Sequence, residues 1–214
     1  MEDGPTYGFD TLQIHAGSRP DPVTGARQTP IYQSTAYVFR DAEHAAALFN
    51  LQEVGYIYSR LTNPTVSVLQ ERIATLEGGV GAVCCSSGHA AQIMALFPLM
   101  SPGCNVIAST RLYGGTVTQF SQTIKRFGWS AKFVDFDDLD AVKNAIDENT
   151  RAVFCEAIAN PGGYITDLKA ISKISDASSS TLRVRRKSEL SFKAFSKVIS
   201  GLNGIIFANL SAKP

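Results

Sequence analysis

The sequence predicts an α/β fold in which a mainly parallel sheet is covered by helices on both faces. From residue 80 onward, short apolar runs that suit strands alternate with longer runs that suit helices. Gly, Pro, Ser, Asn and Asp mark the turns between these runs. Apolar residues make up 44% of the 214 residues, which is enough for a sizeable core.

The alternating region defines the expected sheet. Strands are expected at 80–85, 105–109, 131–136 and 152–155, and helices at 89–100, 115–127, 139–148 and from Asp167 to about Ala177. Repeated strand–helix–strand units imply parallel strands. Ligands bind at the carboxyl ends of such strands. The turn at 86–91, Tyr113 and the loop from Glu156 should therefore share one edge of the sheet.

The N-terminal part is less regular. Residues 1–40 lack sustained periodicity, so we expect an extended arm that packs on something or stays loose. Aromatic residues in this arm favour packing, with a neighbouring subunit as a candidate surface. The expected domains are an arm and inter-subunit segment at 1–60, a partial cofactor-binding α/β domain at 61–177 and a divergent basic tail at 178–214.

Two helices are expected before the alternating region. Asp41 should cap a short helix at 42–51. Asn63 and Pro64 suit the N-cap and first position of the next helix, whose apolar face would carry Val66, Leu69, Ile73 and Leu76. The Gly78-Gly79 pair should end it.

Charge and cysteine content narrow the class of protein. The net charge is +1 and charged residues are 18%, which predicts no strong field for nucleic acid or a membrane surface. The four cysteines show no metal-ligand spacing, so we expect buried free thiols in a reducing compartment. With no apolar signal or spanning run, we expect a cytoplasmic protein.

The turn Ser86-Ser87-Gly88-His89-Ala90-Ala91 lies between an expected strand and an expected helix. Backbone N–H groups converge at such a turn, and the helix dipole favours an anion, so it suits a phosphate. An ordinary tight turn with Gly and Ser remains the alternative, and from these residues alone it is the better-supported one.

Other candidate residues flank this turn. Tyr58 and Arg60 are two apart on an extended segment and can face a phosphate together; the alternative is a surface pair. Tyr113 could stack on a planar ring or be a packed turn aromatic. Asn160 could bind a ligand oxygen or form an Asn-Pro turn, and Glu156 could be simply solvent-exposed.

His15 and His89 are candidate acid–base groups. For His15 a structural role in the arm is favoured. For His89 we expect the backbone N–H, rather than the imidazole, to contribute. His44 is expected on a solvent-facing helix without a role.

Several motifs together occur in a familiar order. They are Phe9-Asp10-Thr11, Ile14-His15-Ala16-Gly17, Pro30-Ile31-Tyr32-Gln33-Ser34-Thr35, Tyr58-Ser59-Arg60-Leu61-Thr62-Asn63-Pro64-Thr65, Leu76-Glu77-Gly78-Gly79, the 86–91 turn, Tyr113-Gly114-Gly115, and Glu156 with Asn160-Pro161-Gly162-Gly163. From Phe9 to about Ala177 the chain resembles the Cys/Met-metabolism family of pyridoxal-phosphate enzymes, and within it the O-acetylhomoserine sulfhydrylases.

The resemblance implies a fold-type-I architecture, pyridoxal 5'-phosphate as cofactor and a homotetramer built as a dimer of dimers. It implies that Ser87, Gly88 and His89 form the phosphate turn, with backbone N–H groups from the last two. Tyr113 would stack on the pyridine ring and Asn160 would contact its hydroxyl side. Tyr58 and Arg60 would reach the phosphate of the neighbouring subunit's cofactor.

The resemblance also implies a reaction: O-acetylhomoserine and sulfide or a thiol give homocysteine or methionine and acetate, with the cofactor as electron sink. A cystathionine γ-synthase or γ-lyase type of enzyme is the alternative within the family. Outside it, the alternatives are a non-catalytic fragment that binds intact subunits and a phosphate-binding domain without pyridoxal. No nucleic-acid or membrane partner is expected.

The resemblance stops at the tail. Residues 177–214 hold seven basic residues and one acidic residue. Where the family has an Asp that pairs the pyridine nitrogen, alignment places Arg185, whose charge would repel a pyridinium. Lys213 lies at about the distance of the cofactor-bonding lysine, but its flanking residues do not match, and Lys193 and Lys197 fare no better.

From this departure we expect an enzyme truncated after about Ala177, with no catalytic lysine identified and no activity alone. Turnover of O-acetylhomoserine with sulfide by the purified chain would contradict this expectation.

Overall fold

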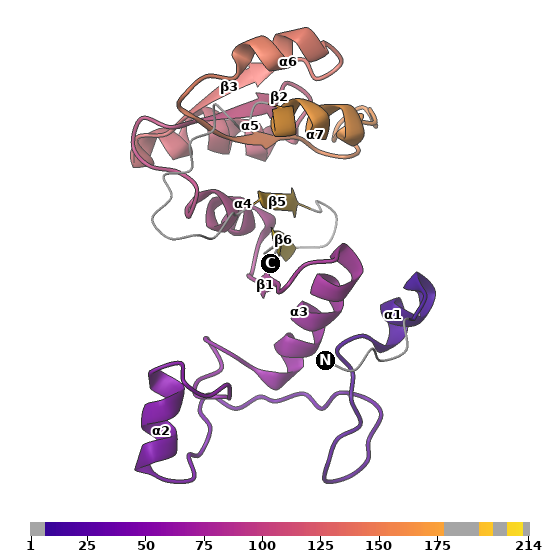
Figure 1. The fold of residues 1–214 in the computed structure, drawn as a ribbon, viewed down its shortest axis with the longest axis vertical. Helices are drawn as coiled ribbons and strands as arrows, with labels where there is room; N and C mark the ends of the chain where they lie inside the picture. The colour runs from indigo at the N-terminus through magenta and orange to yellow at the C-terminus, as the bar shows by residue number, and fades with distance from the viewer. Residues whose placement is uncertain (1–6, 178–192, 199–204, 212–214) are drawn as a thin grey trace. The chain divides into compact units, whose positions relative to one another are not determined.

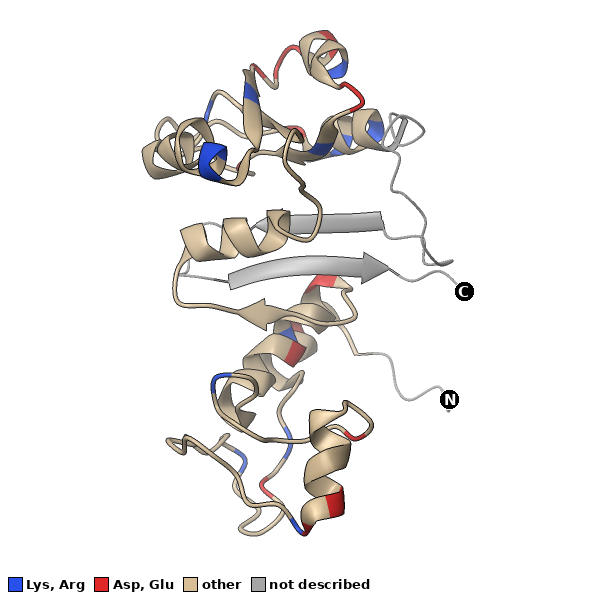
Figure 2. Cartoon of the chain, turned by 90° about the vertical axis from the view of Figure 1, so that its left-hand side faces the viewer, with Lys and Arg blue, Asp and Glu red and all other residues tan. Residues whose placement is uncertain are grey.

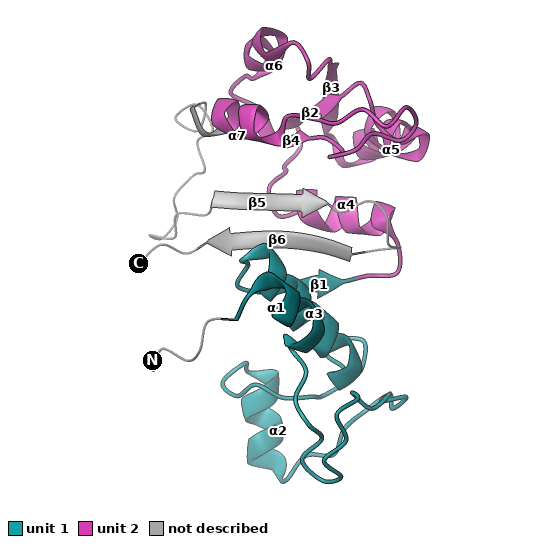
Figure 3. Ribbon diagram, turned by 90° about the vertical axis from the view of Figure 1, so that its right-hand side faces the viewer, with its two compact units in different colours: residues 1–84, 207–211 teal, residues 85–206, 212–214 magenta. Residues whose placement is uncertain are grey.

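The computed structural model describes residues 7–177, 193–198 and 205–211, and it divides the chain into two compact units (Figures 1 and 3). The first unit holds residues 1–84 with 207–211, and the second holds residues 85–206 with 212–214. The domain boundaries expected after residues 60 and 177 remain predictions.

The second unit is built on a parallel sheet. Strands β2 (Asn105–Ser109), β3 (Ser130–Val134) and β4 (Thr150–Phe154) pair in the order β3-β2-β4. Both pairings are parallel, with β2 in the middle. The expected parallel sheet is confirmed for these strands, and the bounds expected for β2 match the structure.

One helix precedes β2, and helices follow each of the three strands of this sheet (Figure 1). They are α4 (Gly88–Leu96), α5 (Gly114–Ser121), the 3-10 helix η1 (Thr123–Phe127), α6 (Leu139–Ala145) and α7 (Leu168–Ala177). The helix expected at 115–127 is therefore two elements, α5 and η1. Asp138 and Asp167 accept hydrogen bonds from the backbone N–H groups of Ala141 and Ala170, as helix caps do.

The core lies on both faces of β2, as expected for a parallel strand. On one face Val106 and Ala108 belong to a cluster with Phe120 of α5. On the other face Ile107 packs with Val142 of α6 and Ile171 of α7. Because side chains alternate along a strand, three consecutive buried residues serve two separate clusters.

The first expected strand is only partly formed. The structure places β1 at Val83–Cys84, two residues instead of the six expected at 80–85, and β1 lies beside β6 (Ile205–Ser211) rather than in the parallel sheet. Val80 and Val83 are exposed, at 70% and 54%. The apolar residues at 80–85 were thus a weak signal for a strand, because Val80 and Val83 are not buried in a core.

The first unit contains α1 (Phe9–His15), α2 (Ala42–Phe49) and α3 (Pro64–Glu77). The caps of the last two are as expected: Asp41 accepts from His44 N and Asn63 accepts from Thr65 N. Gly78 ends α3 in the left-handed conformation at φ 66°. The absence of periodic structure expected for residues 1–40 is wrong for α1.

The arm packs on α3. The Arg72 side chain donates from Nε to the Ala16 carbonyl at 2.9 Å and from Nη2 to Ser18 Oγ at 2.5 Å. Gly17, between these two residues, has φ 74°, and a Cβ built on it would lie 2.5 Å from the Val68 carbonyl oxygen. The turn after α1 is therefore held against α3 by the hydrogen bonds of the Arg72 guanidinium and by the close approach of the Gly17 backbone to α3.

Beyond Ala177 the structure describes two strands, β5 (Lys193–Val198) and β6. Lys193 and Lys197 are on β5, whereas Arg185 and Lys213 lie outside the described residues. The tail at 178–214, although its sequence departs from the resemblance, therefore contains the strands β5 and β6.

A polar network joins the amino ends of β2 and β4. Asp147 accepts from Lys132 Nζ at 2.6 Å and from Asn105 Nδ2 at 2.8 Å. Thr150 Oγ1 donates to the side-chain oxygen Oδ1 of Asn105 at 2.8 Å. The hydrogen bond from Lys132, followed by that from Asn105, lowers the pKa of Asp147 well below its ordinary value of 3.8.

This network predicts a loss of stability in acid. A carboxyl group with a lowered folded-state pKa stabilises the protein above its unfolded pKa, and this contribution is lost as the pH falls through the folded value. The stability difference between wild type and Asp147→Asn should therefore be full above about pH 5 and shrink steadily below 3.8. Urea unfolding across this range measures it, and a constant difference would contradict the assignment.

Acidic and basic residues are interspersed over the described helices and loops (Figure 2). In the described ranges no helix is long and apolar enough to cross a membrane, and no cluster of His, Cys, Asp and Glu could hold a metal ion. The four cysteines form no disulfide. Burial, with a smaller contribution from Glu156, raises the pKa of Cys155 to about 11, so this thiol stays protonated.

Candidate cofactor site

The predicted phosphate turn is the N-terminus of α4. Ser87 caps the helix, since its Oγ accepts from Ala90 N at 3.1 Å. Gly88 is the first helical residue, and no atom lies within 4 Å of the position that a Cβ would take. The first turn has no acidic residue, and its leading N–H groups lack acceptors within the helix. The turn is therefore open and suited to an anion.

Tyr113 lies beside this turn. The rings of His89 and Tyr113 stack with their centroids 5.9 Å apart and their planes at 25°. The Tyr113 side chain is 49% exposed, so part of its surface remains available. The sequence predicted only a backbone role for His89, whereas the structure also gives its imidazole a contact with Tyr113.

Gly115 is required for this stack. A Cβ built on Gly115 would lie 2.6 Å from His89 Cε1 and 2.6 Å from Tyr113 Cε1. The neighbouring Gly114 has open space at the same position. The two glycines therefore differ in importance. Only Gly115 must lack a side chain, because this allows the His89 ring on α4 and the Tyr113 ring to stack.

Glu156 is buried, at 4% exposure, and not solvent-exposed as its alternative interpretation had it. Its Oε1 accepts from Tyr113 N at 2.9 Å and its Oε2 from Asn160 N at 3.0 Å. Asn160 itself is exposed and precedes a cis peptide bond to Pro161. The carboxylate thus joins the two loops that carry candidate ring-facing residues.

Some contacts at the site were not found from the sequence. Gln119 Nε2 donates to the His89 carbonyl at 3.0 Å, and Gln92 Nε2 donates to Thr116 Oγ1 at 3.1 Å. Both glutamines are buried and join α4 to α5. The only sequence signal was the spacing of three that puts Gln92 on the same helix side as His89.

Arg111 was also missed. Its guanidinium lies 4.4 Å from the centroid of the Tyr164 ring and contacts Asp137 at 2.6 Å and Asp135 at 3.4 Å. The hydrogen bond to Asp137 is the main cause that raises the pKa of Arg111. These contacts connect the loop after β2 with the loops after β3 and β4.

Tyr58 and Arg60 belong to the first unit and are described apart from the turn. The Arg60 guanidinium lies 5.5 Å from the Tyr58 ring centroid, so both side chains do lie on one side of the segment. Tyr58 pairs with Ala36 in an isolated antiparallel bridge. Their predicted contact with a neighbouring subunit's cofactor stays a prediction.

The other two histidines are placed as follows. His15 lies in the last turn of α1 and is exposed, so its expected structural role stays a prediction. The expectation of a solvent-facing His44 is wrong: its side chain is 16% exposed, and Nδ1 accepts from Arg40 N at 3.2 Å. Packing against the edge of Phe39 covers this ring.

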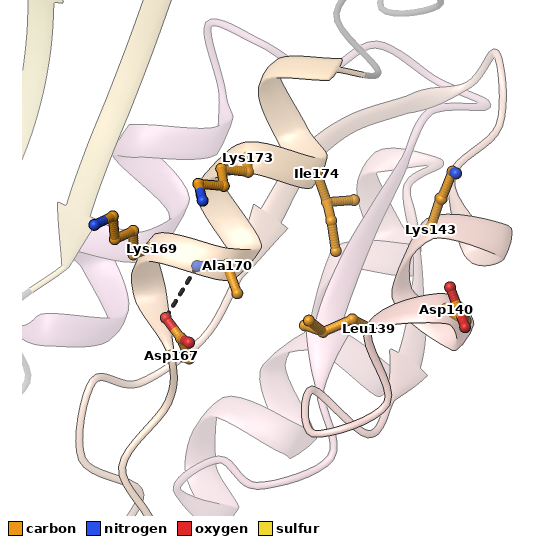
Figure 4. Close-up of a pocket in the computed structure, with 8 residues that line it drawn as sticks. All are labelled: Leu139, Asp140, Lys143, Asp167, Lys169, Ala170, Lys173 and Ile174. Atoms are coloured by element: carbon orange, nitrogen blue, oxygen red, sulfur yellow. Dashed lines mark hydrogen bonds between the residues drawn. The ribbon is translucent and has the colours of Figure 1, made fainter.

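Among the described residues of the second unit, two grooves bear on the position of the site. One of about 520 Å³ runs between α4 and α5, where His89 and Gly115 line it. The other, about 470 Å³, lies between α6 and α7 (Figure 4). In it Leu139 and Ile174 face each other, while Lys169 and Lys173 point away from them. Among the predicted site residues, only His89 lines the first groove and none lines the second, so the first groove adjoins the candidate site.

Two parts of the cofactor expected from the resemblance, its phosphate and its pyridine ring, fit residues of this chain. The open turn at Gly88 suits its phosphate, and the half-exposed Tyr113 ring suits its pyridine face. Among the lysines with described side chains, Lys132 is held by Asp147, Lys143, Lys169 and Lys173 line the α6–α7 groove, and Lys125 is exposed on η1. None of these lysines lines the α4–α5 groove.

The Gly115 contact carries a prediction. Gly115→Ala should separate the His89 and Tyr113 rings and weaken binding of pyridoxal phosphate by about tenfold or more, because a Cβ at 2.6 Å forces both rings to move. Gly114→Ala, which meets open space, is the matched control and should bind as wild type. Cofactor titration followed by tyrosine fluorescence compares them; equal affinities would contradict the prediction.

Comparison with known proteins agrees with this geometry. The chain is 47% identical over 176 residues to homocysteine synthase of Schizosaccharomyces pombe and 49% identical over 166 residues to O-acetyl-L-homoserine sulfhydrylase 1 of Thermus thermophilus. These alignments cover 82% and 77% of this chain but 41% and 39% of the relatives. The chain thus spans about 40% of the length of these relatives.

A solved structure adds support for the fold. An O-acetylhomoserine (thiol)-lyase of Campylobacter jejuni, which holds a pyridoxyl-lysine phosphate, superposes with a TM-score of 0.76 at 45% identity, over 80% of this chain and 42% of that one. Its architecture is fold type I. The model of the Cys/Met metabolism PLP-dependent enzymes matches residues 10–184, seven residues further than expected. The chain therefore belongs to the Cys/Met metabolism family of pyridoxal-phosphate-dependent enzymes.

Proposed function

We propose that this chain forms the cofactor-holding part of an enzyme of the O-acetylhomoserine sulfhydrylase type. The whole enzyme would exchange the acetate of O-acetylhomoserine for sulfide or a thiol, giving homocysteine or methionine. Bound pyridoxal phosphate would supply the electron sink for this γ-replacement.

One observation carries the proposal: the open N-terminus of α4 lies directly beside the half-exposed ring of Tyr113. Gly88 and His89 would donate backbone N–H groups to the phosphate, and Ser87 would keep the helix start in place. Tyr113 would stack on the ring, and Asn160 would bind its hydroxyl side. Relatives named for this reaction at 45% to 49% identity favour it over the cystathionine-forming or lyase alternatives.

Ser87→Asp tests the phosphate site without removing the cap. Asp is as good an N-cap as Ser, so the helix should be retained. Its carboxylate would stand next to the phosphate and repel it. We expect wild type to bind pyridoxal phosphate at least about tenfold more tightly than pyridoxal, and Ser87→Asp to lose that preference. If wild type binds both compounds equally, the proposed phosphate site is wrong.

A second proposal concerns association. In the described part of the first unit, many large apolar side chains are strongly exposed: Phe9 61%, Ile31 76%, Val38 97%, Phe49 63%, Leu51 90% and Val54 101%. Such exposure is typical of a surface covered by another chain. We propose that this unit binds a subunit of the same family, in a homo-oligomer or as a non-catalytic partner of an intact enzyme.

Sedimentation of the purified chain tests this association, alone and mixed with the homocysteine synthase of Schizosaccharomyces pombe. A complex in either sample supports it. The double variant Val38→Ser with Val54→Ser removes two of the most exposed apolar side chains and should weaken the complex. A monomer in both samples would contradict this second proposal and leave the first intact.

A further inference from the structure

Glu156 combines deep burial with an unusual division of its contacts. It follows β4 at the carboxyl end of the strand and is 4% exposed. No lysine, arginine or histidine of the described side chains pairs with it. A buried carboxylate needs hydrogen bonds in place of water, and backbone N–H groups supply them here.

The two oxygens of this carboxylate serve different loops. Oε1 accepts from Tyr113 N, 43 residues away in sequence, and Oε2 accepts from Asn160 N, four residues away. In addition, the Glu156 carbonyl accepts from Thr166 Oγ1 at 2.7 Å, where the loop returns. One side chain therefore holds the backbones of two loops at the same edge of the sheet.

This arrangement leaves the side chains of both loops free. Tyr113 and Asn160 are held through their backbone N–H groups, while the Tyr113 ring is 49% exposed and Asn160 is exposed. The distance between the two backbones is set by the width of one carboxylate. Groups meant to contact opposite parts of one planar ligand need such a constant separation.

We propose that Glu156 is a positioning residue, which sets the separation of Tyr113 and Asn160 for a planar, phosphorylated ligand held at the α4 N-terminus. It acts through these two residues and does not touch the ligand. The ligand class rests on the proposed function, whereas the loop-holding role rests only on the contacts of Glu156.

Glu156→Gln tests the role with little change of shape. An amide offers one acceptor oxygen and one NH2 group, so one of the two backbone N–H groups must face a donor. We expect amide exchange at Tyr113 or Asn160 to become at least about tenfold faster, because a charge-assisted hydrogen bond is lost. Affinity for pyridoxal phosphate should fall by a similar factor.

Glu148→Gln is the matched control. Glu148 is exposed and lies just before β4. Among the described residues, its backbone carbonyl accepts a hydrogen bond from Arg151, but its carboxylate makes no hydrogen bond or ion pair. This variant should keep both exchange rates and the affinity of wild type. Glu156→Asp, whose carboxylate keeps two acceptors on a shorter stem, should recover part of the affinity that Glu156→Gln loses.

The outcomes separate the two proposals. Unchanged exchange at both amides in Glu156→Gln would overturn the positioning role, whatever the ligand. Faster exchange together with no cofactor binding by wild type would retain the loop-holding role and overturn the proposed function. Faster exchange with unchanged cofactor affinity would overturn the claim that the separation of the loops matters for the ligand.

Discussion

Gly17→Ala is expected to release the N-terminal arm from α3. The left-handed φ of 74° costs an alanine about 1 kcal/mol, and its Cβ would lie 2.5 Å from the carbonyl oxygen of Val68. Because that oxygen belongs to a helix, it cannot swing away, so the arm must move instead. The hydrogen bonds of Arg72 to Ala16 and Ser18 would be lost with it. We expect a total loss above about 2 kcal/mol of arm-docking stability.

Gly25→Ala separates the two causes. Gly25 has nearly the same φ, 70°, but nothing lies within 4 Å of its would-be Cβ. This control should therefore show only the conformational cost. Limited proteolysis of residues 16–30 reports on the arm, and thermal unfolding reports on the unit. Equal effects of the two substitutions would show that contact with α3 is not what holds the turn.

Phe120→Ala should be the most damaging change in the second unit. The side chain is fully buried, and its ring meets the Phe154 ring edge-on at 4.8 Å between centroids. Truncation of such a residue leaves a cavity and costs about 3–5 kcal/mol. Because Phe120 joins α5 to β4, the loss should also loosen the edge that carries Tyr113 and Glu156.

Phe97→Ala is the control for Phe120→Ala. Phe97 is 63% exposed, and its ring centroid lies 6.1 Å from that of Trp129 in the same cluster. Its removal should cost less than about 1 kcal/mol. Denaturant unfolding with unchanged slopes would give both values. A Phe120→Ala loss as small as that of Phe97→Ala would show that this core is not cooperative.

The parallel sheet was predictable from the sequence because its strands place apolar side chains in the hydrophobic clusters on both of its faces. Every residue of β2 is buried, so its apolar centre, Val106-Ile107-Ala108, was a dependable signal there. The helix caps at Asp41 and Asn63 were equally dependable, since each acts within three residues of itself. Local chemistry of this kind is fully present in the sequence.

Long-range polar contacts were not predictable in the same way. Glu156 precedes a loop and could equally have faced water; only the fold brings it to Tyr113, 43 residues earlier. The same holds for Arg72, whose partners are more than 50 residues away. The helix α1 was missed because its seven residues include no buried one, so no apolar face marked it.

The central position of β2 has a consequence for synthesis on the ribosome. β2 forms hydrogen bonds with β3 and β4, and its partner Thr150 follows Asn105 by 45 residues. Until β4 leaves the exit tunnel, one edge of β2 is an open template for other chains. During the same interval the backbone N–H of Tyr113 lacks its acceptor, the Glu156 carboxylate. A translational pause before β4 has left the tunnel would therefore give a more aggregation-prone nascent chain than a pause after it has emerged.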